Sequence, residues 1–314
     1  MQVSTQAIRT PASDLAGYAY GATAAIIWGS QLVMNRAGAI HGLDGLDVAA
    51  LRSGFAGLLL LPWFFARPRY GSGPGRVPWL HAIGLALAAG PLFIGASMLG
   101  FHFAPLPHGA VLQPSTMVLT AMLLSATLLH ERLRARRLAG AAIILSGLTL
   151  IAGPALLQGD RMTPIGDGLF IIAGALFASY SVLSKLWSVG PMHATAAAAV
   201  IAGAIFLPPY LLFAGPAHIL ALSWPMLLGQ IFVQAILTGI VSLLAFGRAI
   251  QILGAARASL FPALVPVSAI LIGIPIVGEL PTPLQLTGLL IVTTGLLVAL
   301  STRQTTPVPV SSPR

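Results

Sequence analysis

The chain has 314 residues, of which 57% are hydrophobic and only 7% are charged, whereas an ordinary soluble domain is about 25% charged. So few charged side chains cannot cover a water-soluble surface, and the composition therefore excludes a soluble globular protein. A net charge of +9 would suggest nucleic-acid binding in a soluble chain, but the placement of the basic residues indicates another role. The absence of cysteine excludes disulfides, thiolate metal sites and cysteine nucleophiles.

Apolar runs long enough to cross a hydrocarbon layer of about 30 Å recur along the whole chain. They predict five transmembrane helices in the first half, at residues 15–34, 46–66, 80–104, 110–129 and 138–157. Five more are predicted in the second half, at residues 165–186, 195–214, 226–246, 258–277 and 284–300. The polar, proline-rich segment 301–314 is predicted to be a disordered cytoplasmic tail. We therefore expect an all-α integral membrane protein with no inserted soluble domain.

The basic residues predict the orientation of these helices, because Lys and Arg near helix ends are retained on the cytoplasmic side. With a cytoplasmic N-terminus, only Arg36 and Arg161 fall outside, and Arg52 lies within a span. The cytoplasmic set comprises Arg9, Arg67, Arg69, Arg76, Arg132, Arg134, Arg136, Arg137, Lys185, Arg248, Arg257, Arg303 and Arg314. This bias predicts a multi-pass protein of the inner (plasma) membrane with both termini in the cytoplasm, and no nucleic-acid partner.

The two halves of the chain are similar to each other. At a fixed offset of 148 residues, 11 of the 48 positions from Pro105 to Ala152 match the second half without gaps. The matched pairs include Pro114 with Pro262, Glu131 with Glu279, Gly140 with Gly288, and Gly147 with Gly295. Because five helices is an odd number, the second copy enters the membrane from the opposite side. We therefore predict two inverted five-helix repeats, 15–157 and 165–300, a common construction of secondary transporters.

Several segments resemble EamA-type members of the drug/metabolite transporter superfamily. The first-helix motif is Trp28-Gly29-Ser30, and the first repeat is recognised by His108-Gly109-Ala110, Pro114 and Glu131-Arg132-Leu133. The second repeat is recognised by Phe246 to Ile250, Gly254 to Ala258, Pro262 to Pro266 and Gly278-Glu279. The resemblance implies ten helices, a central cavity and export of amino acids, metabolites or drugs. It also implies that the fifth and tenth helices pack at the periphery, in some members at a homodimer contact.

Polar side chains within spans need partners in the protein interior, so their spacing indicates which helix faces look inward. In the eighth span Gln230, Gln234 and Thr238 recur every four residues, and the fourth span carries a similar stripe that ends at Thr127. The first span contributes Thr23 beside its motif. Residues predicted to contact substrate are Trp28, Ser30, Gln31, Arg52, Gln113, Thr116, Thr120, Tyr180, Ser184, Gln230, Gln234 and Thr238. The alternative is that Ser, Thr and Gln supply interhelical hydrogen bonds.

Arg52 is the most informative charge, because it lies roughly 9 Å inside the second span at the helical rise. It either faces an aqueous cavity, where it would hold a substrate carboxylate, or snorkels to the membrane surface. Three prolines, Pro114, Pro262 and Pro266, lie inside predicted spans, where each removes a backbone hydrogen bond. They are predicted to act as hinges, with a static packing kink as the alternative.

The chemistry within the membrane favours a carrier. All seven acidic residues lie at or outside span ends, so no carboxylate relay for protons is visible and the energy coupling stays open. The seven histidines are scattered without metal-ligand spacing, so we expect no catalytic residue, metal or cofactor. The leading hypothesis is a secondary transporter that exports small molecules, such as amino acids or drugs, by alternating access. The alternatives are an intramembrane enzyme and a passive channel.

Overall fold

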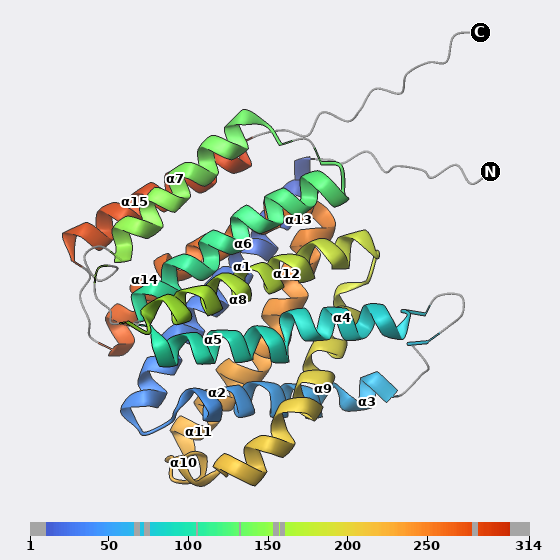
Figure 1. The fold of residues 1–314 in the computed structure, drawn as a ribbon, viewed down its shortest axis with the longest axis vertical. Helices are drawn as coiled ribbons and strands as arrows, with labels where there is room; N and C mark the ends of the chain where they lie inside the picture. The colour runs from blue at the N-terminus through green and yellow to red at the C-terminus, as the bar shows by residue number, and fades with distance from the viewer. Residues whose placement is uncertain are drawn as a thin grey trace.

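The computed structural model describes residues 11–65, 70–71, 76–104, 106–131, 133–152, 157, 161–277 and 282–301. Within these residues the regular secondary structure is helical, apart from one isolated bridge between Tyr70 and Val77. Most helices lie roughly alongside one another in a bundle (Figure 1). The predicted site residues all fall in the described part of the chain, whereas Glu279 and the tail beyond Ser301 lie outside it.

The first half of the chain forms helices where the apolar runs predict them. Its elements are α1 (Pro11–Ile40), α2 (Gly45–Ala50), the π-helical η1 (Leu51–Phe55), α3 (Ala56–Phe65), α4 (Trp79–Ala89), α5 (Pro91–Phe103), α6 (Leu106–Leu128) and α7 (Ala135–Ala152). The consecutive elements α2, η1 and α3 form the predicted second span. The third predicted span is divided at Gly90 into α4 and α5.

The second half repeats this pattern with more interruptions. Its elements are α8 (Thr163–Leu186), α9 (Pro191–Pro209), η3 (Tyr210–Ala214), α10 (Ala217–Leu220), α11 (Trp224–Gln230), η4 (Ile231–Val241), α12 (Ser242–Leu253), α13 (Ala255–Ala258), η5 (Phe261–Leu264), α14 (Val265–Val277) and α15 (Pro283–Leu300). The elements η3 and η4 are π-helical, and η5 is a 3₁₀ helix.

Eight helices in the described part of the chain are long and apolar enough to cross a membrane. The helices α1, with 30 residues, and α7, with 18 residues, are not among these eight, although at the helical rise they are about 45 and 27 Å long. Large apolar side chains cover the outside of the bundle; for example, Leu80 is 79% exposed and Phe213 is 88% exposed. Such a surface is incompatible with water and suits lipid.

Helices α7 and α15 lie side by side along one edge of the molecule (Figure 1). They run antiparallel, because Gly140 near the start of α7 meets Ala299 at the end of α15 and Gly147 meets Val292. A Cβ atom on Gly147 would lie 2.8 Å from the backbone nitrogen of Val292. The matched glycines of the two halves therefore allow close backbone approach, as small residues do between membrane helices.

The two halves of the chain are interleaved. Helix α1 of the first half packs against α12 and α14 of the second, and helix α8 of the second half packs against α5 and α6 of the first. Glycines mark both contacts: a Cβ on Gly29 would lie 2.4 Å from Cβ of Ser268 in α14, and a Cβ on Gly174 would lie 2.5 Å from the carbonyl oxygen of Gln113 in α6. The corresponding helices of the halves thus make corresponding contacts.

The beginning of α1 and the end of α15 lie at the same end of the molecule, because the hydroxyl of Tyr18 donates a 3.4 Å hydrogen bond to the carbonyl of Leu300. Buried Arg257 of α13 binds the beginning of α1: its guanidinium lies 3.5 Å from the Asp14 carboxylate and also donates to the hydroxyl of Tyr18. Below, this end is called the terminal end, and the other the opposite end.

Candidate substrate-binding pocket

A pocket lies among four helical segments, two from each half of the chain. Its cavity volume is about 20 Å³, room for about one water molecule in the described structure. Its lining residues are Arg52, Ser53, Ala56, Ala89, Gly90, Ile94, Ala198, Ala199, Ala202, Gly239 and Leu243. These residues lie near the middle of four candidate membrane spans, Gly45–Phe65, Trp79–Phe103, Pro191–Ala214 and Trp224–Leu253. The pocket is therefore central both across the membrane and between the halves.

The backbone around the pocket departs from regular α-helix on three sides. Arg52 and Ser53 lie in η1, Gly239 lies in η4, and Gly90 separates α4 from α5. Irregular backbone within a membrane is tolerated where it is buried in protein or lines a cavity, and π-helical turns are frequent at functional sites. The three irregularities meet at one place, which favours a functional pocket over a packing defect.

The lining is approximately symmetric between the halves. Gly90 and Gly239 are 149 residues apart, as are Ile94 and Leu243. The same spacing relates Ser53 to Ala202. Each half therefore contributes similar residues to opposite sides of one pocket. Arg52 breaks this symmetry, because the residue 149 positions later is the apolar Ile201.

Arg52 is the one charged side chain that lines the pocket. Among the described residues it makes no side-chain hydrogen bond and no ion pair. The neighbouring Ser53 hydroxyl is buried and also has no hydrogen-bond partner there. The structure thus places the predicted Arg52 in a pocket wall, and adds Ser53, which the sequence analysis missed.

The predicted stripe of the eighth span is fully buried. Nε2 of Gln230 donates a 2.7 Å hydrogen bond to the carbonyl of Met34, and Nε2 of Gln234 donates to Oδ1 of Asn35 at 2.6 Å and to Oε1 of Gln230 at 3.2 Å. These bonds join the second half to α1, as interhelical hydrogen bonds would. Oε1 of Gln234 and the hydroxyl of Thr238 are buried without a hydrogen-bond partner in the described residues, and Thr238 directly precedes Gly239 of the pocket.

Trp28 belongs to an aromatic cluster that connects the halves. Its ring packs edge-on against Phe177 of α8 and Phe246 of α12, at centroid distances of 5.6 and 5.2 Å. Tyr180 is buried in the same core. Its hydroxyl interacts electrostatically with Thr195 but has no partner with hydrogen-bond geometry. Trp28 and Tyr180 are not among the residues that line the pocket.

The other predicted contact residues are not among those that line the pocket. Ser30 and Ser184 donate to carbonyls of their own helix, and Gln113 accepts a long 3.5 Å hydrogen bond from Ser97. Half-buried positions are occupied by Gln31, Thr116 and Thr120. The prediction that Thr23 and Thr127 face inward is wrong, because both side chains are exposed. Thr127 satisfies its hydroxyl on the carbonyl of Leu123 in its own helix, so it needs no interior partner.

The predicted prolines occupy different local structures. Pro114 lies inside the unbroken α6, whereas Pro262 lies in the first turn of η5 and Pro266 in the first turn of α14. A first helical turn tolerates proline, because its backbone N–H has no intrahelical acceptor there. The matched prolines therefore interrupt the second half but not the first, and their role as hinges stays a prediction.

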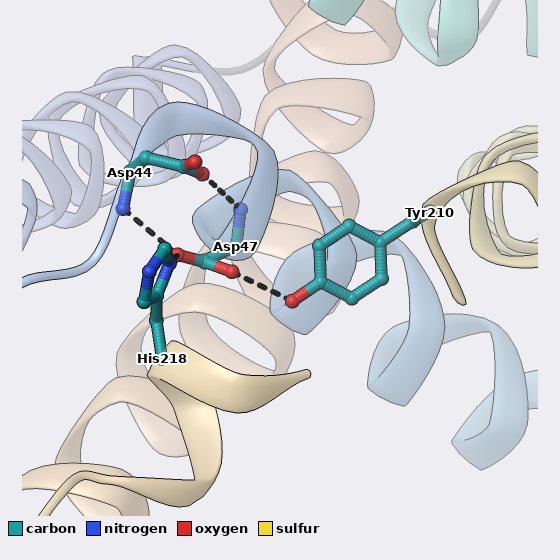
Figure 2. Close-up of polar contacts among 4 residues, drawn as sticks. All are labelled: Asp44, Asp47, Tyr210 and His218. Carbon is teal, nitrogen blue, oxygen red and sulfur yellow. Dashed lines mark hydrogen bonds and ion pairs between the residues drawn. The ribbon is translucent and has the colours of Figure 1, made fainter. Parts of the chain in front are cut away.

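A polar cluster at the opposite end joins the two halves of the chain (Figure 2). Asp47 in the first turn of α2 is buried, and its carboxylate accepts a 2.6 Å hydrogen bond from the hydroxyl of Tyr210 and lies 3.2 Å from Nδ1 of His218. Asp44 and Asp47 form a capping box at the start of α2. The Asp44-x-x-Asp47 spacing in the sequence is typical of such a cap. Tyr210 and His218, which contact Asp47, are far away in the sequence and could not be predicted from it.

The comparisons with known proteins agree with this fold. The EamA-like transporter family matches residues 15–153 and 164–301, one match in each half. A solved structure described only as the crystal structure of a protein superposes with a TM-score of 0.71, covering 93% of this chain and 98% of that chain. Its sequence identity is 20%, so this likeness concerns the fold alone. No curated protein matches significantly. Because the family match spans most of the sequence and the helices are apolar, the chain is a multi-pass membrane protein that belongs to the EamA-like transporter family.

Proposed function

We propose that the protein is a secondary carrier that exports a small anionic solute by alternating access at the Arg52 pocket. In this proposal ten transmembrane helices form two inverted five-helix repeats. The protein lies in the plasma membrane, with both termini on the cytoplasmic side. Support comes from the interleaved packing of the two halves, the antiparallel α7–α15 pair and the central pocket to which both contribute. Two similar halves around a midplane site are suited to rocking about that site.

The observation that carries the proposal is the position of Arg52. A cation at the centre of a membrane helix costs about 2.5 to 3.5 kcal/mol on insertion scales, and here no described residue offsets that cost with a hydrogen bond or an ion pair. Arg52 instead belongs to the wall of a pocket, and a guanidinium that faces this pocket can bind a carboxylate with two parallel hydrogen bonds. The adjacent Ser53 hydroxyl is free to donate a further bond.

Contacts at both ends of the molecule are suited to act as gates. At the opposite end Asp47 of the first half is bonded to Tyr210 and His218 of the second. At the terminal end the hydroxyl of Tyr70 donates a 2.8 Å hydrogen bond to the carbonyl of His193. Each contact joins the segment around α2 and α3 to the segment around α9. Alternating access would break these contacts in turn.

The alternatives have weaker support. An intramembrane enzyme needs convergent nucleophiles, acid–base pairs or metal ligands, whereas the pocket wall contains one ionisable side chain, Arg52, and one hydroxyl, Ser53, among alanine, glycine and aliphatic residues. A passive channel would conduct ions and would not saturate. A carrier would show saturable uptake and counterflow, so the two are separated by measurement.

The test is uptake by vesicles reconstituted with the purified chain. Radiolabelled pyruvate, lactate and glutamate are supplied one at a time, with the unlabelled acid as competitor and, for pyruvate and lactate, with the neutral amide as a second competitor. We expect saturable uptake of at least one acid, inhibition by the acid and not by its amide, and at least a tenfold loss in Arg52→Ala. Arg36→Ala is the matched control, because Arg36 is exposed on α1. Equal uptake by Arg52→Ala and the control would refute the anion site.

A further inference from the structure

We propose that this carrier is an obligatory anion exchanger, in which the pocket changes sides rapidly only while an anion neutralises Arg52. The inference rests on the proposed function and specifies its mode of operation. Its basis is the charge balance of the pocket in the described structure, where Arg52 is the one charged residue of a mostly apolar wall and no acidic residue belongs to that wall.

The nearest acidic residue along the helix cannot neutralise Arg52. Asp47 lies five residues earlier, which is about 7.5 Å along the axis at the helical rise. One of its carboxylate oxygens accepts the hydrogen bond of Tyr210, and the other accepts from the backbone of Asp44 and lies beside His218. Asp47 is therefore committed to its own cluster (Figure 2), and Arg52 keeps an uncompensated charge.

Water is a poor substitute for a carboxylate in this pocket. Of the lining side chains only Arg52 and Ser53 are polar, and the rest are alanine, glycine, isoleucine and leucine. A bound water needs two to four polar partners to be stable, and these walls offer few. While the pocket is open to one side, bulk water can still solvate the guanidinium. When it is closed to both sides, that solvation is lost.

This difference in solvation makes the rate at which the pocket changes sides depend on whether an anion is bound. An alternating-access carrier must pass through a state in which its pocket is closed to both sides. An empty pocket reaches that state with an unpaired buried cation, whereas a loaded pocket reaches it with an ion pair. A ligand that interacts more favourably with the closed state than with the open ones shifts the equilibrium toward it. The loaded carrier should therefore change sides much faster than the empty one, and transport becomes one-for-one exchange.

The experiment compares exchange with net efflux in the same vesicles. They are loaded with whichever acid of the panel pyruvate, lactate and glutamate gives the highest saturable uptake, in radiolabelled form. They are then diluted into buffer that contains either the unlabelled acid or no transportable anion. Potassium and valinomycin hold the membrane potential at zero, so that charge build-up does not itself slow net efflux. We expect exchange to exceed net efflux by at least about tenfold.

Variants separate the charge from the shape of the pocket. Arg52→Lys keeps the cation, so we expect a ratio of exchange to net efflux well above one even if the affinity falls. Arg52→Gln removes the cation, so we expect a ratio near one in whatever transport remains. Arg36→Gln, on the exposed side of α1, should leave the ratio as in the unmodified protein.

The outcomes distinguish the two proposals. Saturable transport with an exchange-to-efflux ratio near one in the unmodified protein would overturn obligatory exchange and leave the carrier intact. A ratio that stays high in Arg52→Gln would also overturn it, because the coupling would then not depend on this charge. Absence of saturable transport for every acid of the panel would instead overturn the proposed anion carrier itself.

Discussion

The hydroxyl of Tyr210 donates a 2.6 Å hydrogen bond to the carboxylate of Asp47, and this bond joins the end of α9 to the start of α2 across 163 residues of sequence (Figure 2). Both residues are buried. A hydrogen bond to a charged group contributes about 1.5 to 3 kcal/mol. The bond is therefore strong enough to help hold these two segments together at the opposite end of the molecule.

Replacing Tyr210 by phenylalanine should open that end more often. The loss leaves a buried carboxylate short of a donor, so we expect the open population to rise about tenfold. Because the chain contains no cysteine, Ala199→Cys gives a single reporter in the pocket wall, and its labelling rate with an impermeant maleimide measures opening. Tyr20→Phe serves as the matched control, since Tyr20 is 41% exposed on α1. Unchanged labelling in Tyr210→Phe would show that this bond does not control access.

Removal of His218 should have a smaller effect than removal of the Tyr210 hydroxyl. The side chain of His218 is 61% exposed and lies 3.2 Å from Asp47, and exposed ion pairs contribute about 0 to 1 kcal/mol. We therefore expect His218→Gln to change maleimide labelling by less than about fivefold in the same Ala199→Cys background. If His218→Gln exceeded Tyr210→Phe in this assay, the exposed histidine would be the main element of the closure.

The close packing of α7 and α15 predicts intolerance of a methyl group at Gly147. Its Cβ would lie 2.8 Å from the backbone nitrogen of Val292 and 2.9 Å from the carbonyl oxygen of Gly288, so the two backbones must move apart. We expect Gly147→Ala to lower the midpoint of thermal unfolding in detergent by several degrees. Gly168→Ala is the control, because no atom lies within 4 Å of a Cβ there. Equal midpoints for the two variants would contradict the close contact.

The buried glutamines give a prediction that separates structural from substrate-binding roles. Nε2 of Gln234 donates to both Asn35 and Gln230, and removing it leaves buried acceptors unpaired at about 1 to 3 kcal/mol each. We expect Gln234→Ala to lower thermal stability, with little further loss when Asn35→Ala is added, because the two share one bond. A variant of unchanged stability whose KM for the transported acid rises would instead place Gln234 in the substrate site.

The sequence predicted the helices well and the pocket only in part. Long apolar runs determine where membrane helices form, and an isolated charge such as Arg52 is conspicuous within one. The pocket wall, in contrast, consists mainly of residues such as Ala198 and Ala202, which carry no chemical sign of a site in the sequence. Threonine spacing is a poor indicator of the inward face of a helix, since Thr127 bonds to its own helix and can face outward. The partners of Asp47 required the tertiary structure.

The close contacts around Gly90 indicate that the pocket has little room for an added side chain at this position. It ends α4 with a non-helical backbone, and a Cβ there would lie 2.4 Å from the carbonyl oxygen of Ala86 and 3.0 Å from Cβ of Ala202. Ala202 lines the same pocket from α9, so a methyl group would push α4 and α9 apart or fill the space between them. We expect Gly90→Ala to reduce vesicle uptake of the transported acid at least tenfold, even where the protein still folds by size-exclusion chromatography in detergent. Gly95→Ala, on α5 with nothing within 4 Å of its Cβ, should transport normally. Normal uptake by folded Gly90→Ala would mean that substrate does not use the space beside this glycine.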